Sequence, residues 1–152
     1  MTRSTPDLAS AFADLCRSND FIAVFAFGSR ANEIAARLRC EGPRSISPES
    51  DLDLGILPPH EADFNVQRIV RFALAAEELF GLARADIVDL RKAPPYLALD
   101  AIRGERVYCA DDFQAANFEL FVLRRAGDLA FHERERRRML LEPHAELDVG
   151  SS

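Results

Sequence analysis

The sequence predicts an α+β fold, in which a small mixed β-sheet is flanked by helices and followed by a C-terminal helix. Short apolar runs rich in phenylalanine and β-branched residues alternate with longer segments of helical periodicity. The length of 152 residues, 48% of them apolar and 29% charged, suits one globular domain with one core. We therefore expect one domain over residues 1–142 and a disordered tail over residues 143–152.

The charge and the hydropathy pattern exclude several classes of function. The formal net charge is -6 at pH 7, whereas a protein that binds duplex nucleic acid normally presents a basic stripe to the phosphates. The first residues lack the apolar core of a secretory signal, and no apolar run approaches the ~20 residues that span a bilayer. We expect a cytoplasmic protein with no duplex nucleic acid and no membrane among its partners.

The cysteines and histidines do not predict a zinc site. The cysteines are odd in number and widely spaced, which argues against a disulfide framework or a four-ligand cluster. The histidines include no i, i+4 pair that would share one helical face. We expect idle thiols and surface or helix-capping histidines. These residues are Cys16, Cys40, Cys109, His60, His132 and His144.

The first part of the chain predicts a helix, a buried strand and a second helix. Residues 6–18 open with a proline and repeat apolar side chains at helical spacing. Residues 21–27 form an apolar run that stops at Gly28, and its length suits a central strand covered on both faces. Residues 29–39 favour a helix, for which Ser29 is the expected N-cap.

The middle of the chain predicts a loop, a strand, a long helix and another strand. Glycine, proline and serine make residues 40–50 an exposed and mobile loop. Residues 52–57 indicate a strand that a proline pair closes, and residues 63–80 indicate an amphipathic helix that ends at Gly81. Residues 85–90 form the next short apolar strand.

The last part of the chain predicts a helix, a brief strand and the C-terminal helix. Residues 94–103 favour a helix opened by proline, and residues 106–109 favour a strand. From Asp111 the apolar pattern is helical as far as Pro143. The charged run at residues 132–138 fits a solvated helix face with i, i+4 charge pairs, and a partner surface is the alternative.

An Asp-x-Asp pair at the start of the second strand points to metal binding. Alternate residues of a strand lie on one face, so the carboxylates of Asp51 and Asp53 lie a few ångströms apart. Buried side by side, two like charges need compensation, which a raised pKa or a hard divalent cation such as Mg²⁺ supplies. Taken alone, the pair also fits a solvated strand end.

Gly28 and Ser29 predict a phosphate-binding turn. They stand between a buried strand and the start of a helix, where backbone N–H groups and a hydroxyl can approach a phosphate chain closely. Arg30 either adds charge-assisted contacts to the phosphates or is an ordinary surface arginine. A third carboxylate, Asp86, stands in another short apolar strand, where it can complete a metal site near an attacking hydroxyl.

These motifs together resemble the DNA polymerase β-like nucleotidyltransferase superfamily in its minimal form. The matching segments are FAFGSR at 25–30, SDLDLGI at 50–56 and ADIV at 85–88. The order of elements and the C-terminal helix are similar as well. Asp86 has the superfamily's hydrophobic-Asp-hydrophobic-hydrophobic context, whereas Asp89 faces the other side of the strand and suits a strand-end carboxylate.

The resemblance implies a role for each matching residue. Gly28 and Ser29 hold the triphosphate of ATP, Asp51 and Asp53 bind Mg²⁺ or Mn²⁺, and Asp86 joins the metal site and helps to activate the acceptor hydroxyl. The connection at residues 30–50 is longer than is common in the superfamily, so it covers the nucleotide or obstructs it.

The resemblance also implies a biological role. Minimal members are often antitoxins that transfer AMP from ATP to a tyrosine of a partner toxin of the HEPN ribonuclease family, which makes an enzyme of this kind the first expectation. An antitoxin that binds its toxin without turnover is the second. Nucleotidyl transfer to a small hydroxylated molecule is the third, although little chain remains after Asp86 for a substrate domain.

Overall fold

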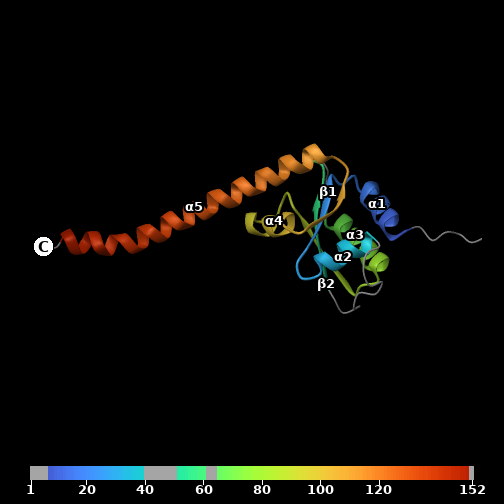
Figure 1. Ribbon diagram of the computed structural model, residues 1–152, viewed down its shortest axis with the longest axis horizontal. Coiled ribbons are helices and arrows are strands. Elements are labelled where there is room, and N and C mark those ends of the chain that lie inside the picture. Colours follow the sequence, from blue (N-terminus) through green and yellow to red (C-terminus); the bar gives the residue numbers. More distant parts are fainter. Residues whose placement is uncertain (1–6, 40–50, 61–64, 151–152) are drawn as a thin grey trace, which may run out of the picture.

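The computed structural model describes residues 7–39, 51–60 and 65–150, which fold into helices and a single sheet (Figure 1). The predicted loop at residues 40–50 lies outside the described residues. Mixed helices and strands in this order confirm the predicted α+β class. The elements are α1 (Leu8–Ser18), β1 (Ala23–Phe27), α2 (Ala31–Leu38), β2 (Asp51–Leu57), α3 (Val66–Phe80), β3 (Arg84–Asp89), α4 (Pro95–Ile102), β4 (Glu105–Cys109) and α5 (Asp112–Gly150).

The sheet has the strand order β3-β2-β1-β4 and is mixed, as the sequence predicts. β1 pairs antiparallel with both β2 and β4, while β2 and β3 run parallel. In this register Asp53 lies opposite Phe27 on one side and opposite Asp86 on the other. The C-terminal end of β1 therefore meets the N-terminal halves of β2 and β3 at one end of the sheet.

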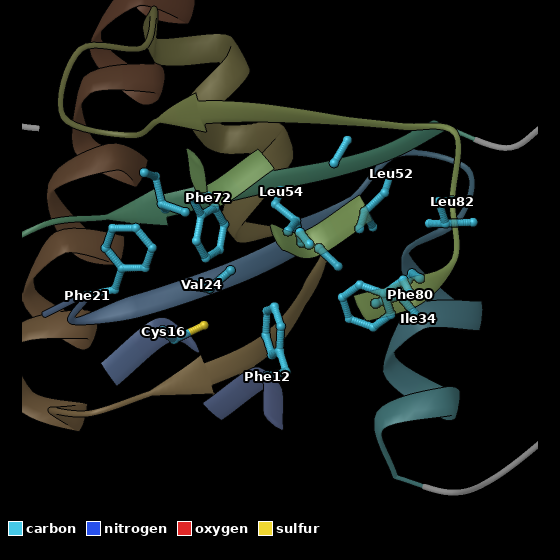
Figure 2. Packing of buried hydrophobic residues seen from close by; sticks show 14 of the residues in the cluster. Phe12, Cys16, Phe21, Val24, Ile34, Leu52, Leu54, Phe72, Phe80 and Leu82 are labelled. Atoms are coloured by element: carbon cyan, nitrogen blue, oxygen red, sulfur yellow. The ribbon is translucent and has the colours of Figure 1, made fainter. Parts of the chain in front are cut away.

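One face of the sheet packs against α1, α2 and α3, and Figure 2 shows this core at close range. Val24, Leu52 and Leu54 project from the strands toward these helices. Phenylalanines fill the space between them, with the ring of Phe21 edge-on to that of Phe72 at 5.0 Å between centroids. Replacing a buried phenylalanine of this kind with alanine lowers the free energy of unfolding by about 3–5 kcal/mol.

The other face of the sheet packs against α4 and the first part of α5. Gly55 makes this possible on β2, because a Cβ there would lie 3.0 Å from the Cβ of Ala101 and 2.8 Å from a methyl of Leu90. From α5, the small and large side chains of Ala115, Phe118 and Val122 complete the layer. Strand alternation places Asp51 and Asp53 on this same face, at its open end.

The helix boundaries confirm one predicted signal and correct another. Gly81 ends α3 in the left-handed conformation with φ 68°, as expected. Ser29 is not the N-cap of α2, because the turn continues to Arg30 and the N–H of Ala31 donates to the carbonyl of Gly28 at 3.4 Å. The predicted cap was wrong, and the Ser29 hydroxyl stays in the turn that follows β1.

Helix α5 continues far beyond the body of the molecule and through Gly150 (Figure 1). The helix includes residues 143–150, which belong to the segment for which the sequence predicts a disordered tail. The limit of the domain at residue 142 stays a prediction. In the part of the chain that the structure describes, no helix combines the length and apolar character that a bilayer crossing needs.

Candidate active site

The three aspartates predicted from the sequence lie together at one end of the sheet. Asp51 and Asp53 are two apart on β2 and share a face, and the parallel register sets Asp86 of β3 directly beside Asp53. Asp51 is exposed, whereas Asp53 and Asp86 are half-buried. Two strands therefore bring three carboxylates to one open face.

Gly28 brings the turn after β1 against this acidic group. Its φ is 79°, a conformation that L side chains rarely adopt. A Cβ at this position would lie 2.6 Å from Oδ2 of Asp53, which is closer than real Cβ contacts. Glycine is thus required here for the backbone conformation, and a Cβ would in addition displace the Asp53 carboxylate.

The charges around Asp53 are not balanced by protein groups alone. Burial raises the pKa of the Asp53 carboxyl, and the neighbouring charges of Asp86 and Asp51 raise it further, while Arg84 lowers it. The raised pKa means that the folded protein holds this carboxylate at a cost. A bound cation would remove that cost.

Arg84 is a member of the site that the sequence motifs did not single out. Its Nε donates to Oδ1 of Asp86 at 3.0 Å, and in the register its Cα pairs with that of Asp51. The signal was present, because Arg84 stands two residues before Asp86 and so shares its face of the strand. Both side chains of the pair are well exposed, so its contribution to stability is small.

The residues of this end of the sheet fit a hard divalent cation by their chemistry. Asp51, Asp53 and Asp86 offer only oxygen donors, which Mg²⁺ prefers, and their mutual repulsion calls for positive charge. Over the described ranges, no three acidic, histidine or cysteine side chains are already gathered as a metal cage. One of the three carboxylates, that of Asp86, is paired with Arg84 instead.

Ser29 and Arg30 differ in how they are placed. Ser29 is exposed beside Gly28, and its hydroxyl has no hydrogen-bond partner within the described residues. Arg30 donates from Nη1 to Oε1 of Glu33 at 2.9 Å on the first turn of α2. Ser29 is therefore available for a phosphate, whereas Arg30 must first leave Glu33.

Asp89 stands apart from the acidic group. It is the last residue of β3, and its Oδ1 accepts a hydrogen bond from the N–H of Arg91 at 3.0 Å. Its neighbours of the same parity, Ala85 and Ile87, pack in the core beneath α1, α2 and α3. A strand-end role for Asp89, as the sequence predicts, agrees with these contacts.

Comparison with solved structures shows the same fold in toxin–antitoxin complexes. A toxin–antitoxin structure with AMP-PNP matches with a TM-score of 0.63 and 15% identity over 88% of this chain and 98% of that one. A tri-AMPylated Shewanella oneidensis HEPN toxin in complex with MNT antitoxin matches with a TM-score of 0.61 and 14% identity over 88% and 96%. The MntA–HepT toxin–antitoxin structure gives 0.60 and 16% over 88% and 97%. At these identities the matches establish the fold alone.

Comparison with family models identifies the chain more directly. No curated protein matches the sequence significantly. The model described as "Polymerase beta, Nucleotidyltransferase" matches residues 12–113, which is more than half of the chain and includes Gly28, Ser29 and all three aspartates. The protein therefore belongs to the polymerase β-type nucleotidyltransferase family.

Proposed function

We propose that this protein is a Mg²⁺-dependent antitoxin that transfers AMP from ATP to a tyrosine hydroxyl of a partner HEPN toxin. The observation that carries the proposal is the contact between the Gly28 turn and the Asp53 carboxylate, which joins the expected phosphate cradle to the acidic group. The fold shared with an AMP-PNP-bound complex and with a complex of a tri-AMPylated toxin supports it.

The binding of ATP is divided among three elements. The turn after β1 offers the backbone of Gly28 and the hydroxyl of Ser29 to the triphosphate. Asp51 and Asp53 hold Mg²⁺, with Mn²⁺ as a substitute, and the ion when bound neutralises charge on the phosphates. Because transfer of this kind depends mainly on position and charge, these contacts supply most of what the reaction needs.

Asp86 acts on the acceptor. Its carboxylate takes the proton of the tyrosine hydroxyl, the oxygen bonds to the α-phosphorus, and the bond from that phosphorus to the β-phosphate oxygen breaks, so that pyrophosphate leaves. Arg84, whose Nε donates to Oδ1 of Asp86 at 3.0 Å, keeps that carboxylate oriented until the metal and nucleotide bind.

An antitoxin that only covers its toxin is the second candidate. The observation in its favour is the set of large apolar side chains that α5 leaves exposed, including Phe113, Leu120 and Phe131, which are 75%, 50% and 56% exposed. Apolar side chains on a projecting helix can dock a partner without any chemistry. The third Asp of the acidic group has no role in this alternative.

Intact-mass spectrometry separates the two candidates. We expect wild-type protein with ATP and Mg²⁺ to add one or more AMP masses to its cognate toxin. Asp86→Ala should slow this transfer by about 100- to 10,000-fold, the usual effect of losing a general base, and should leave most of the ATP binding in place. Asp89→Asn is the matched control, because Asp89 lies on the other face of β3.

The contrary result is equally clear. If wild-type protein adds no mass and Asp86→Ala still neutralises the toxin fully in cells, the protein acts by occlusion. Equal loss of activity in Asp86→Ala and Asp89→Asn would show that β3 has a structural role and that Asp86 has no special one.

A further inference from the structure

A second candidate ligand site lies at the end of the sheet opposite the acidic group. The acidic group stands where β2 and β3 begin, whereas this site stands where they end and where α5 starts. The two are separated by the length of β2, roughly 20 Å at 3.3 Å per residue. A ligand in one site therefore does not reach the other.

The site is a hollow of about 590 Å³, within the usual range of small-molecule pockets. Most of its lining surface is apolar, and the polar groups of four side chains converge on the same space, a combination that is typical of binding pockets. Its lining residues come from after β2, after β3 and from the first turns of α5. They are His60, Arg91, Gln114, Asn117, Phe118 and Phe121.

Arg91 gives the hollow a fixed positive charge. Its Nε donates to the carbonyl of Pro58, and its guanidinium lies 5.9 Å from the centroid of the Phe118 ring. Nη1 lies 3.2 Å and 3.4 Å from the two ring nitrogens of His60. Burial lowers the pKa of Arg91, while the charge of Asp89 raises it. A partly desolvated guanidinium held in one orientation is suited to an anion.

Phe121 gives the hollow an aromatic wall. Its side chain is 52% exposed, although it packs against Phe118 at 6.3 Å between ring centroids. On one face the guanidinium carbon of Arg125 lies 5.5 Å from the ring centroid. An exposed ring beside cations is a platform on which planar bases stack.

Two amides supply the groups that read the edge of a base. Gln114 Nε2 donates to Oδ2 of Asp111 at 2.8 Å, which leaves the Gln114 amide oxygen as an acceptor. Asn117 is exposed and has no hydrogen-bond partner in the described part of the chain, so it can both donate and accept. Such amides bind the amino group and ring nitrogen of adenine.

We propose that this hollow is a second nucleotide site, which binds an adenine mononucleotide with its base on Phe121 and its phosphate on Arg91 and His60. The site uses neither the aspartates nor a divalent cation, because its positive charge comes from the protein. This distinguishes it from the site where ATP is expected to react.

Calorimetry with AMP in the presence of EDTA tests the proposal, because the chelator silences a metal-dependent site. We expect one AMP to bind per chain. Phe121→Ala should weaken binding about tenfold or more, as expected for the loss of a stacking ring, and Asn117→Ala should weaken it severalfold. Leu120→Ala is the matched control, since Leu120 is 50% exposed on the same helix but does not line the hollow. It should bind AMP as the wild type does.

Further ligands and variants test whether the hollow is specific for AMP and separate from the acidic group. Adenosine and inorganic phosphate should each bind more weakly than AMP, and Asp51→Asn with Asp53→Asn should leave AMP binding unchanged. The proposal fails if AMP does not bind in EDTA, if Phe121→Ala binds normally, or if the double aspartate variant loses binding. It also fails if benzoate binds as tightly as AMP, because the hollow would then accept any aromatic anion.

Discussion

The two ends of the sheet differ in charge, although the same two strands, β2 and β3, contribute to both. Where the strands begin, three carboxylates lie together, and Arg84 is exposed and paired with one of them, Asp86. Where they end, Arg91 is half-buried against Phe118 and His60 and faces a hollow. The first end is suited to a ligand that brings its own cation, and the second to a bare anion.

The largest effect that this comparison predicts concerns Asp51 and Asp53. Replacing both by asparagine should remove the Mg²⁺-dependent part of ATP binding. The loss of affinity should exceed the roughly 10- to 100-fold that follows from mutating a residue that only hydrogen-bonds to a metal ligand. AMP binding in EDTA, at the other end, should persist in the same variant. Calorimetry with and without Mg²⁺ measures both. If ATP binding with Mg²⁺ is unchanged, the aspartates do not hold the metal.

The next effect concerns two glycines that share a left-handed backbone. Gly28→Ala and Gly81→Ala both place a side chain at positive φ, 79° and 68°, which costs about 1–2 kcal/mol. Only at Gly28 does the new Cβ meet an atom, Oδ2 of Asp53, at 2.6 Å, whereas Gly81 has nothing within 4 Å. We expect both variants to melt earlier, and Gly28→Ala alone to lose Mg²⁺-dependent ATP binding.

The Gly81 variant gives this prediction its control. If Gly81→Ala impairs ATP binding as much as Gly28→Ala does, the loss reflects general destabilisation. If Gly28→Ala binds ATP normally, the turn after β1 yields without disturbing the carboxylate, and the contact with Asp53 is not needed for binding.

The two ends of the sheet also differ in how well the sequence predicts them. Strand alternation and the apolar runs were enough to predict the fold class and the shared face of Asp51 and Asp53. Ser29 was misplaced as a cap, because local propensity does not show that the turn continues to Arg30. Alternation within β3 was enough to predict that Arg84 and Asp86 share a face, but it does not reveal the parallel pairing of β2 with β3 that sets Asp86 beside Asp53.

The hollow could not be predicted from the sequence. His60, Arg91 and Phe121 come from three separate segments, and only the order of the strands and the path of α5 bring them together. The sequence predicts surface or capping histidines, and it gives no signal that His60 lies against a guanidinium. Motifs confined to one segment were predictable, whereas a site assembled from three was not.

A smaller effect is expected when Asp53 is replaced, and it concerns the stability of the metal-free protein. The pKa of Asp53 is raised in the folded state by burial and by Asp86 and Asp51. Its ionisation therefore opposes folding, and the penalty grows as pH rises through the raised pKa and disappears below the pKa of the unfolded chain. Asp53→Asn should raise the melting temperature at pH 7 and flatten its dependence on mildly acidic pH. Calorimetric melting in EDTA measures this, and a lower melting temperature would identify Asp53 as a structural residue.

The smallest effect is expected at Asp111, beside the start of α5. Oδ1 of Asp111 accepts from the N–H of Gln114 at 3.1 Å and Oδ2 from its Nε2 at 2.8 Å, and these bonds lower the pKa of the carboxyl. A lowered pKa stabilises the fold above the pKa of the unfolded chain, and this contribution is lost as pH falls through the folded value. Asp111→Ala should therefore lower the melting temperature slightly at pH 7 and have less effect in acid. Asp111→Asn keeps one acceptor for the helix N–H but no charge, so its melting temperature at pH 7 should lie between those of the alanine variant and the wild type, without this pH dependence. If the asparagine variant is destabilised as much as the alanine variant at pH 7 and both differences vanish in acid, the charge of Asp111 and not its capping bond supports the start of α5.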